Sequence, residues 1–130
     1  MHAVIFDIDG TLLHSAAVDD ALYRQAVRDV LGDVQLRGSL HDYEYVTDTG
    51  ILWSILDDND LDREGYVDTV RSRFVELVEQ HVREAGPFDE IAGAGELLRT
   101  LRTSPRHAVA MATGGWRQSA ELKLDSAGID

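Results

Sequence analysis

Two short apolar runs, one near each end of the chain, predict β-strands. The first covers residues 3–6 and stops at Asp7, and the second covers 107–112 and stops at Thr113. Continuous apolar runs bounded by turn signals are typical of strands buried on both faces of a parallel sheet. We therefore expect two buried parallel strands, each followed directly by polar residues.

Amphipathic helices are predicted for most of the remaining chain. Apolar residues recur at helical spacing in several segments, and Gly, Gly-Pro or Ser-Pro follows most of these segments as a stop signal. The predicted helices cover residues 18–31, a shorter element from about 49 to 56, then 62–84, 94–103 and 116–127.

This order of elements predicts an α/β fold with an inserted helical part. Two strands of the same character, joined through helices, imply a parallel arrangement. The helical stretch before the second strand, roughly seventy residues, is far longer than an ordinary crossover connection. We predict that residues 15–87 form a helical subdomain over the strand ends, while 1–14 and 88–130 form the α/β core.

Asp7 and Asp9 are the first candidates for chemistry. They lie two positions apart where the first strand ends, and Gly10 and Thr11 follow them. Buried carboxylates must be paired, protonated or bound to a metal, and ligands of open α/β sheets bind at the carboxyl ends of the strands. The pair therefore indicates a functional site rather than a packing feature.

Composition and charge narrow the possible partners. The chain has 130 residues, 44% of them hydrophobic, and 24 acidic against 12 basic residues give a net charge of −12. Such a field repels nucleic acids and anionic membranes, so neither is an expected partner. It also repels an anionic substrate unless a bound cation reverses the local sign. The absence of cysteine excludes disulfides, thiolate metal sites and cysteine nucleophiles.

Targeting signals are not evident in the sequence. The apolar start is short, lacks a preceding basic region and runs directly into acidic residues, unlike a signal peptide. No apolar run approaches the length of a membrane span. We expect a cytoplasmic protein, and we make no prediction about its oligomeric state.

The motif Asp7-Ile8-Asp9-Gly10-Thr11-Leu12 resembles the first motif of the haloacid dehalogenase-like hydrolase superfamily. Ala112-Thr113-Gly114-Gly115, after the second strand, resembles the second motif. The resemblance extends over essentially the whole chain. It implies a Rossmann-like parallel-sheet core, incomplete in this chain, with an α-helical cap inserted after the first motif.

The resemblance also implies roles for the residues of the first motif. Asp7 would be the nucleophile that forms an aspartyl-phosphate, and Asp9 would be the general acid and then the general base. Thr11 would hold the turn, contribute to phosphate binding and fix the Asp9 side chain. Relatives that cleave carbon–halogen bonds lack an acid at the position of Asp9, so its presence favours a phosphatase.

A magnesium ion and a phosphate group are the ligands that the resemblance implies. A carboxylate oxygen of Asp7 and the backbone carbonyl of Asp9 would bind Mg²⁺, which favours hard oxygen donors with water and substrate phosphate completing its shell. Thr113 and the backbone N–H of Gly114 would bind the phosphate oxygens at a helix N-terminus. The predicted activity is therefore magnesium-dependent hydrolysis of a small phosphorylated metabolite.

The sequence departs from the family in lacking an evident downstream lysine and a further acidic pair. Lys123 is a candidate for the lysine, but its mid-helix position favours a solvated side chain. Two or three strands are also too few for a stable layered domain. We expect the chain to be the N-terminal part of a longer enzyme and to have little activity alone.

Alternatives remain open at this point. A phosphomutase would share both motifs, and a truncated, non-catalytic scaffold would keep the fold without turnover. Trp116 is a packing residue that could also touch substrate, because it follows the phosphate loop directly. His14 could face the site entrance, although a surface role is favoured.

Overall fold

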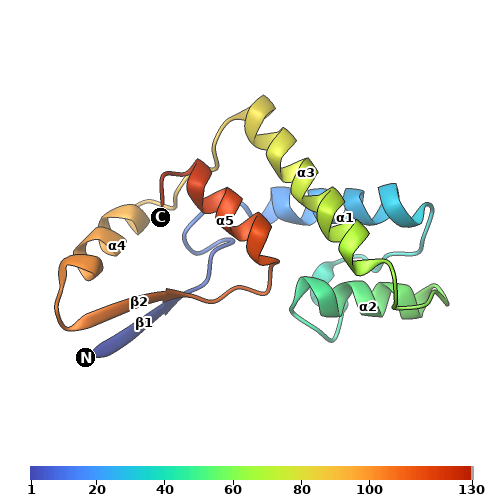
Figure 1. Cartoon of the computed structure of the whole chain (residues 1–130), viewed down its shortest axis with the longest axis horizontal. Coiled ribbons are helices and arrows are strands. Elements are labelled where there is room, and N and C mark those ends of the chain that lie inside the picture. The colour runs from blue at the N-terminus through green and yellow to red at the C-terminus, as the bar shows by residue number, and fades with distance from the viewer. Residues whose placement is uncertain (130) are drawn as a thin grey trace.

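The computed structural model describes residues 1–129 and shows an α/β chain with a small sheet and mostly helical structure (Figure 1). The predicted fold class is confirmed. In chain order the elements are β1 (His2–Phe6), α1 (Ala16–Leu31), the short 3-10 helix η1 (Leu40–Asp42), α2 (Asp48–Asp58), α3 (Val67–Ala85), α4 (Ala94–Thr103), β2 (His107–Met111) and α5 (Arg117–Ser126).

Strands β1 and β2 pair in parallel, as the sequence predicts, with His2 opposite His107 and Phe6 opposite Met111. The expectation that β1 is buried on both faces is wrong for the described part of the chain. Ile5 in β1 is 64% exposed, since within residues 1–129 the sheet has two strands and the side chains of one face lack a covering layer. Helix α4 packs against β2.

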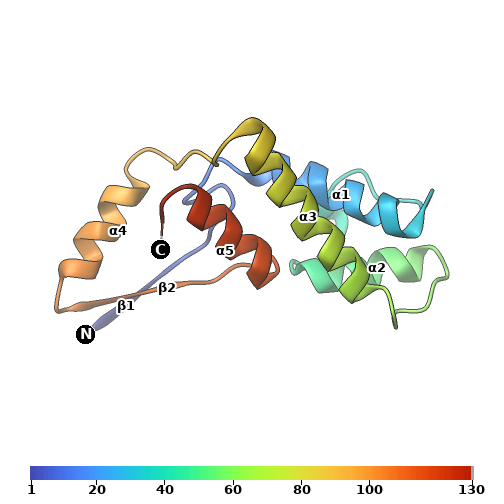
Figure 2. The same ribbon diagram turned by 45° about the horizontal axis from the view of Figure 1, so that its top comes forward.

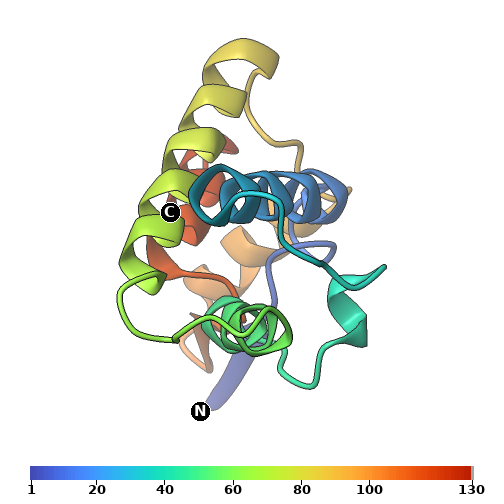
Figure 3. The ribbon, with the colours of Figure 1, turned by 90° about the vertical axis from the view of Figure 1, so that its right-hand side faces the viewer.

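Helices α1, α2 and α3 lie together at one end of the molecule, and β1, β2 and α4 lie at the other (Figure 2). Helix α1 packs on α3, which also contacts α5, so α5 lies between the two ends. Viewed from the helical end, α3 runs across α1, with α2 below both (Figure 3). Within residues 1–129, no helix combines the length and the apolar character that crossing a bilayer requires.

An aromatic cluster joins the helical end to the sheet end. Tyr23 of α1 stacks on Trp116, which precedes α5, with ring centroids 5.7 Å apart. Phe74 of α3 meets both rings edge-on at 5.9 Å. Because such pairs prefer these geometries and the rings are buried, the cluster fixes α1 and α3 relative to the loop after β2.

Most helix boundaries agree with the sequence prediction. Helix α4 has the predicted bounds, and Val70, Phe74, Leu77 and Val78 of α3 are buried as its apolar stripe predicts. Helix α3 begins five residues later than predicted, at Val67 rather than 62. Gly65, two residues before the helix, has a left-handed backbone conformation at φ +88°. An α-helix cannot continue through this conformation, so α3 begins after it.

Candidate active site

Asp7 and Asp9 leave the end of β1 on either side of a buried isoleucine. Ile8 is 1% exposed, and its carbonyl oxygen accepts hydrogen bonds from the N–H groups of residues 11, 12 and 13. Gly10, at φ +79°, allows the chain to turn back, and its N–H donates to the Leu13 carbonyl at 2.9 Å. The tight turn anchors Ile8 in the core, and the two acids both line one pocket.

The Asp9 carboxylate is held by two donors. Its Oδ1 accepts from the Ser15 hydroxyl at 2.5 Å and from Lys123 Nζ at 2.8 Å. We expected the Thr11 hydroxyl to fix this side chain, and in the structure Ser15 makes that contact instead. Thr11 is exposed and is not among the residues that line the pocket, although its backbone N–H closes the turn.

Lys123 corrects a prediction, because it is buried rather than solvated. Its side chain is 1% exposed, and Nζ donates to Asp19 as well as to Asp9, at 2.5 and 2.8 Å. Burial lowers the pKa of Lys123, but the adjacent carboxylates of Asp19 and Asp9 outweigh it, so the pKa is raised above its usual value. The ammonium group is therefore charged and compensates for two neighbouring acids.

A helical pattern in the sequence could have revealed this burial. Ala120, Lys123 and Leu124 share one face of α5 at spacings of three and four, and all three are buried. The prediction placed the lysine on the solvent side because of its position in the middle of the helix. A lysine on the apolar stripe of a helix needs a buried anionic partner, which Asp9 and Asp19 supply.

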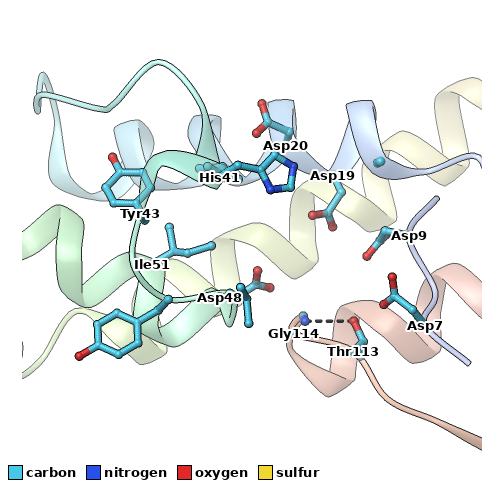
Figure 4. A pocket seen from close by; sticks show the side chains of 15 residues that line it. Asp7, Asp9, Asp19, Asp20, His41, Tyr43, Asp48, Ile51, Thr113 and Gly114 are labelled. Carbon is cyan, nitrogen blue, oxygen red and sulfur yellow. Dashed lines mark hydrogen bonds between the residues drawn. The ribbon is translucent and has the colours of Figure 1, made fainter. Parts of the chain in front are cut away.

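The loop after β2 forms another wall of the pocket. Thr113, Gly114 and Gly115 line it together with Asp7 and Asp9 (Figure 4). The N–H of Gly115 donates to Thr113 Oγ1 at 3.1 Å, so this hydroxyl accepts there and keeps its own proton for a ligand oxygen. The structure therefore brings both predicted motifs to the same pocket, with Thr11 as the exception.

Asp48, at the start of α2, is a site residue that sequence reasoning missed. Its N–H donates to the Gly114 carbonyl at 2.8 Å, and its Oδ2 accepts from the Trp116 N–H at 3.1 Å. Burial, followed by the charge of Asp19, raises the pKa of Asp48 to about 7. In the sequence Asp48 looks like an ordinary residue of a helix first turn, so only the tertiary contact identifies it.

Further hydrogen bonds hold the same junction. Tyr23 Oη donates to the Asp48 carbonyl at 2.6 Å, and Trp116 Nε1 donates to Thr49 Oγ1 at 2.8 Å. Trp116 is 8% exposed and does not line the pocket, so it acts as a packing and positioning residue. His14 is also outside the pocket, and the histidine that lines it is His41.

The pocket has a volume of about 310 Å³, near the lower end of the range for small-molecule sites. Figure 4 shows Asp7, Asp9 and Thr113 on one side, with Asp19, Asp48 and His41 on the side formed by α1, η1 and α2. Tyr43 and Ile51 complete the far wall. The site therefore lies between the ends of the strands and the helical group.

The donor set fits a magnesium ion. The Asp7 side chain has no hydrogen-bond or ion-pair partner among residues 1–129, so its carboxylate oxygens are available, whereas the Asp9 side chain is held by Ser15 and Lys123 and would contribute its backbone carbonyl instead. Mg²⁺ commonly takes one or two protein carboxylates and completes its shell with water and substrate phosphate. Within the described residues no group of three or more His, Cys, Asp or Glu side chains is arranged to hold a metal.

The sequence matches the haloacid dehalogenase-like hydrolase family over residues 1–130. The chain belongs to this family of hydrolases. No curated protein matches it in sequence.

Solved structures share its fold. A hydrolase from Pseudomonas syringae superposes with a TM-score of 0.75 and 21% identity, covering 100% of this chain and 57% of that one. CbbY from Rhodobacter sphaeroides in complex with phosphate gives 0.70 and 18% identity, covering 97% and 56%. A mutant of CbbY in complex with xylulose-(1,5)bisphosphate gives 0.66 and 19%, again covering 97% and 56%. The chain thus spans a little more than half the length of these proteins.

Proposed function

We propose that this protein is a magnesium-dependent phosphohydrolase that cleaves a small phosphorylated metabolite through an aspartyl-phosphate on Asp7. The observation that supports it most is the meeting of Asp7, Asp9 and Thr113 in one pocket at the ends of two parallel strands. Membership of the haloacid dehalogenase-like hydrolase family also supports it. Helices α1 to α3, within residues 15–87, would be the cap, and 1–14 with 88–130 the core.

The first half of the reaction would transfer the phosphoryl group to the protein. A carboxylate oxygen of Asp7 attacks phosphorus, and the bond from phosphorus to the leaving oxygen breaks. Asp9, in its protonated form, donates its proton to that oxygen, so the product leaves as a neutral alcohol. Thr113 and the N–H of Gly114 would hold the non-reacting phosphate oxygens, where negative charge is concentrated.

The second half would return the protein to its starting state. Asp9, now a carboxylate, accepts a proton from a water molecule whose oxygen attacks phosphorus, and the bond from phosphorus to Asp7 breaks. Ser15 and Lys123 keep the Asp9 carboxyl group in place through both steps. When bound to Asp7 and Asp9, Mg²⁺ would neutralise phosphate charge and so offset the acidity of the pocket.

Magnesium titration of the protein in its longest native form tests the proposal. Hydrolysis of p-nitrophenyl phosphate should require Mg²⁺, should disappear on EDTA addition and should fall by at least about a thousandfold in Asp7→Asn, because the nucleophile is lost. Asp33→Asn, at an exposed position outside the pocket, is the matched control and should behave as wild type. Magnesium-independent turnover, or an active Asp7→Asn, would refute the proposal. Complete inactivity would favour the scaffold alternative.

A further inference from the structure

The phosphate loop, residues 113–115, has little within itself to fix its conformation. Gly114 and Gly115 follow Thr113, and glycine loses more conformational freedom on folding than any other residue. The hydrogen bond that the structure shows inside the loop runs from the Gly115 N–H to Thr113 Oγ1. A ligand binds more tightly when the groups that receive it are already ordered. The phosphate loop therefore needs support from another part of the chain.

Asp48, at the start of α2, supports the phosphate loop at two points (Figure 4). Its N–H donates to the Gly114 carbonyl at 2.8 Å, and its Oδ2 accepts from the Trp116 N–H at 3.1 Å. These two groups belong to the peptide planes on either side of Gly115, so one residue holds both planes. The next plane carries the Gly114 N–H, which has no acceptor within residues 1–129 and is the group assigned to the phosphate.

Asp48 is itself held firmly. Its side chain is buried, and Tyr23 Oη donates to its carbonyl at 2.6 Å. The side chain of Thr47 caps the N-terminus of α2 by accepting from the Gly50 N–H. A carboxyl group can accept a hydrogen bond whether it is ionised or protonated, so this support does not depend on the charge of Asp48. An ordered helix start thus determines the conformation of a glycine-rich loop.

We infer that Asp48 is a positioning residue for phosphate binding, which acts through the backbone of the phosphate loop rather than through contact with the substrate. The inference rests on the proposed function and assigns part of its phosphate affinity to the helical group. Asp9 is held separately, by Ser15 and Lys123, so loss of the Asp48 contact should weaken phosphate binding much more than proton transfer.

A pair of variants at position 48 tests the inference. Asp48→Ala and Asp48→Asn both lack the negative charge, but only asparagine keeps an acceptor for the Trp116 N–H. Isothermal titration calorimetry with inorganic phosphate and saturating Mg²⁺, on the longest native form, measures binding. We expect Kd to be at least about tenfold higher in Asp48→Ala than in Asp48→Asn, because phosphate must then order the loop. The KM for p-nitrophenyl phosphate should rise in the same ratio, while kcat changes less than about threefold.

Two further variants separate positioning from a general loss of stability. Thr49→Val removes the acceptor of Trp116 Nε1 at the same junction but no contact of the phosphate loop, so phosphate affinity should stay at the wild-type value. Gly115→Ala, added to Asp48→Ala, should recover part of the lost affinity because alanine reduces the freedom of the loop. A Cβ at position 115 fits, since its nearest contact is Thr113 Oγ1 at 3.4 Å.

A measurement on the wild type covers the case in which Asp48→Ala does not fold. If Asp48 orders the loop, the backbone N–H groups of Gly115 and Trp116 should have NMR order parameters of about 0.85 without phosphate. Values below about 0.6, or equal phosphate affinity in the two position-48 variants, would overturn the inference. Magnesium-dependent hydrolysis by the wild type would still uphold the proposed function in that case. A wild type that neither binds phosphate nor hydrolyses p-nitrophenyl phosphate would reject both.

Discussion

At the scale of single residues, Lys123 and its two acidic partners form the most consequential contact in the chain. Lys123 joins Asp9 of the first motif to Asp19 of α1, so one ammonium group connects the site to the helical group. A buried ion pair contributes little net stability over an apolar replacement of both partners, but removal of one partner leaves an uncompensated charge. Lys123 therefore neutralises the charge of the two buried acids and also holds the Asp9 side chain in position.

Replacement of this lysine should destabilise the protein. In Lys123→Met the chain length of the side chain is kept, but Asp9 and Asp19 then face each other without a cation. We expect the free energy of unfolding to fall by about 3 kcal/mol. Urea denaturation followed by circular dichroism measures the change.

A double variant provides the control for this prediction. Asp19→Asn combined with Lys123→Met removes one of the repelling charges and should recover part of the lost stability. Wild-type stability in Lys123→Met, or no recovery in the double variant, would show that the contact has no energetic role.

Asp48 should make stability depend on pH. Folding raises its pKa to about 7 through burial, so the folded state holds this proton more tightly than the unfolded chain does. Between about pH 4, where an unfolded aspartate titrates, and pH 7, the unfolding free energy should fall by about 1.4 kcal/mol per pH unit relative to a variant that cannot titrate.

Asp48→Asn is that variant, because its side-chain oxygen can still accept from the Trp116 N–H. The stability difference between wild type and Asp48→Asn should therefore shift in favour of the variant as the pH rises through this window. Asp33→Asn, at an exposed position, should show no such trend. If the difference in unfolding free energy between wild type and Asp48→Asn stayed constant from pH 4 to pH 7, Asp48 would not have a raised pKa in the folded state.

At the scale of elements, the junction between the start of α2 and the loop after β2 sets the geometry of the site. Gly114 lies so close to the backbone of Val46 that a Cβ at position 114 would overlap the Val46 carbonyl oxygen. The Asp48 N–H to Gly114 carbonyl hydrogen bond depends on this approach. Gly114 is therefore required by packing between two segments far apart in the sequence.

Gly114→Ala should push these two segments apart. We expect a loss of about 1–3 kcal/mol in unfolding free energy, typical of overpacking, together with a raised KM for p-nitrophenyl phosphate because Thr113 and the 114 N–H move. Gly38→Ala, where an added Cβ meets only ordinary contact distances, is the control for thermal denaturation and kinetics. If KM were unchanged in Gly114→Ala, the packing between Gly114 and Val46 would not influence phosphate binding.

Sequence periodicity predicted the elements well and their tertiary partners poorly. Both strands and the stripe of α3 follow from local apolar patterns, and the Asp7 and Thr113 motifs follow from residue types at strand ends. Helix α3 begins later than predicted because Asp60 and Gly65, which precede it, adopt left-handed backbone conformations that the periodicity of apolar residues does not predict. Asp48 and Lys123 owe their roles to contacts over more than sixty residues of sequence. The apolar stripe of α5 indicates that Lys123 is buried but does not identify its acidic partners, and no local pattern identifies Asp48.

At the scale of the whole molecule, the net charge and the topology of the chain are both consistent with the proposed magnesium-dependent phosphohydrolase. A chain with a net charge of −12 places five aspartates around one pocket, so the phosphate binding that we propose there would need a bound cation. The parallel pairing of β1 with β2 carries both loops to one end of the sheet, next to α1 and α2. One face of the described sheet, which includes Ile5 of β1 and Ala108 and Ala110 of β2, lacks a covering layer.

Covalent capture of the phosphoryl group tests the central claim most directly. The protein in its longest native form, mixed with Mg²⁺ and excess phosphomonoester and quenched rapidly in acid, should yield a peptide that carries one phosphoryl group on Asp7 by mass spectrometry. The Asp7→Asn variant should yield none. A phosphoryl group on another residue, or hydrolysis by wild type with no adduct at any quench time, would contradict Asp7 as the nucleophile.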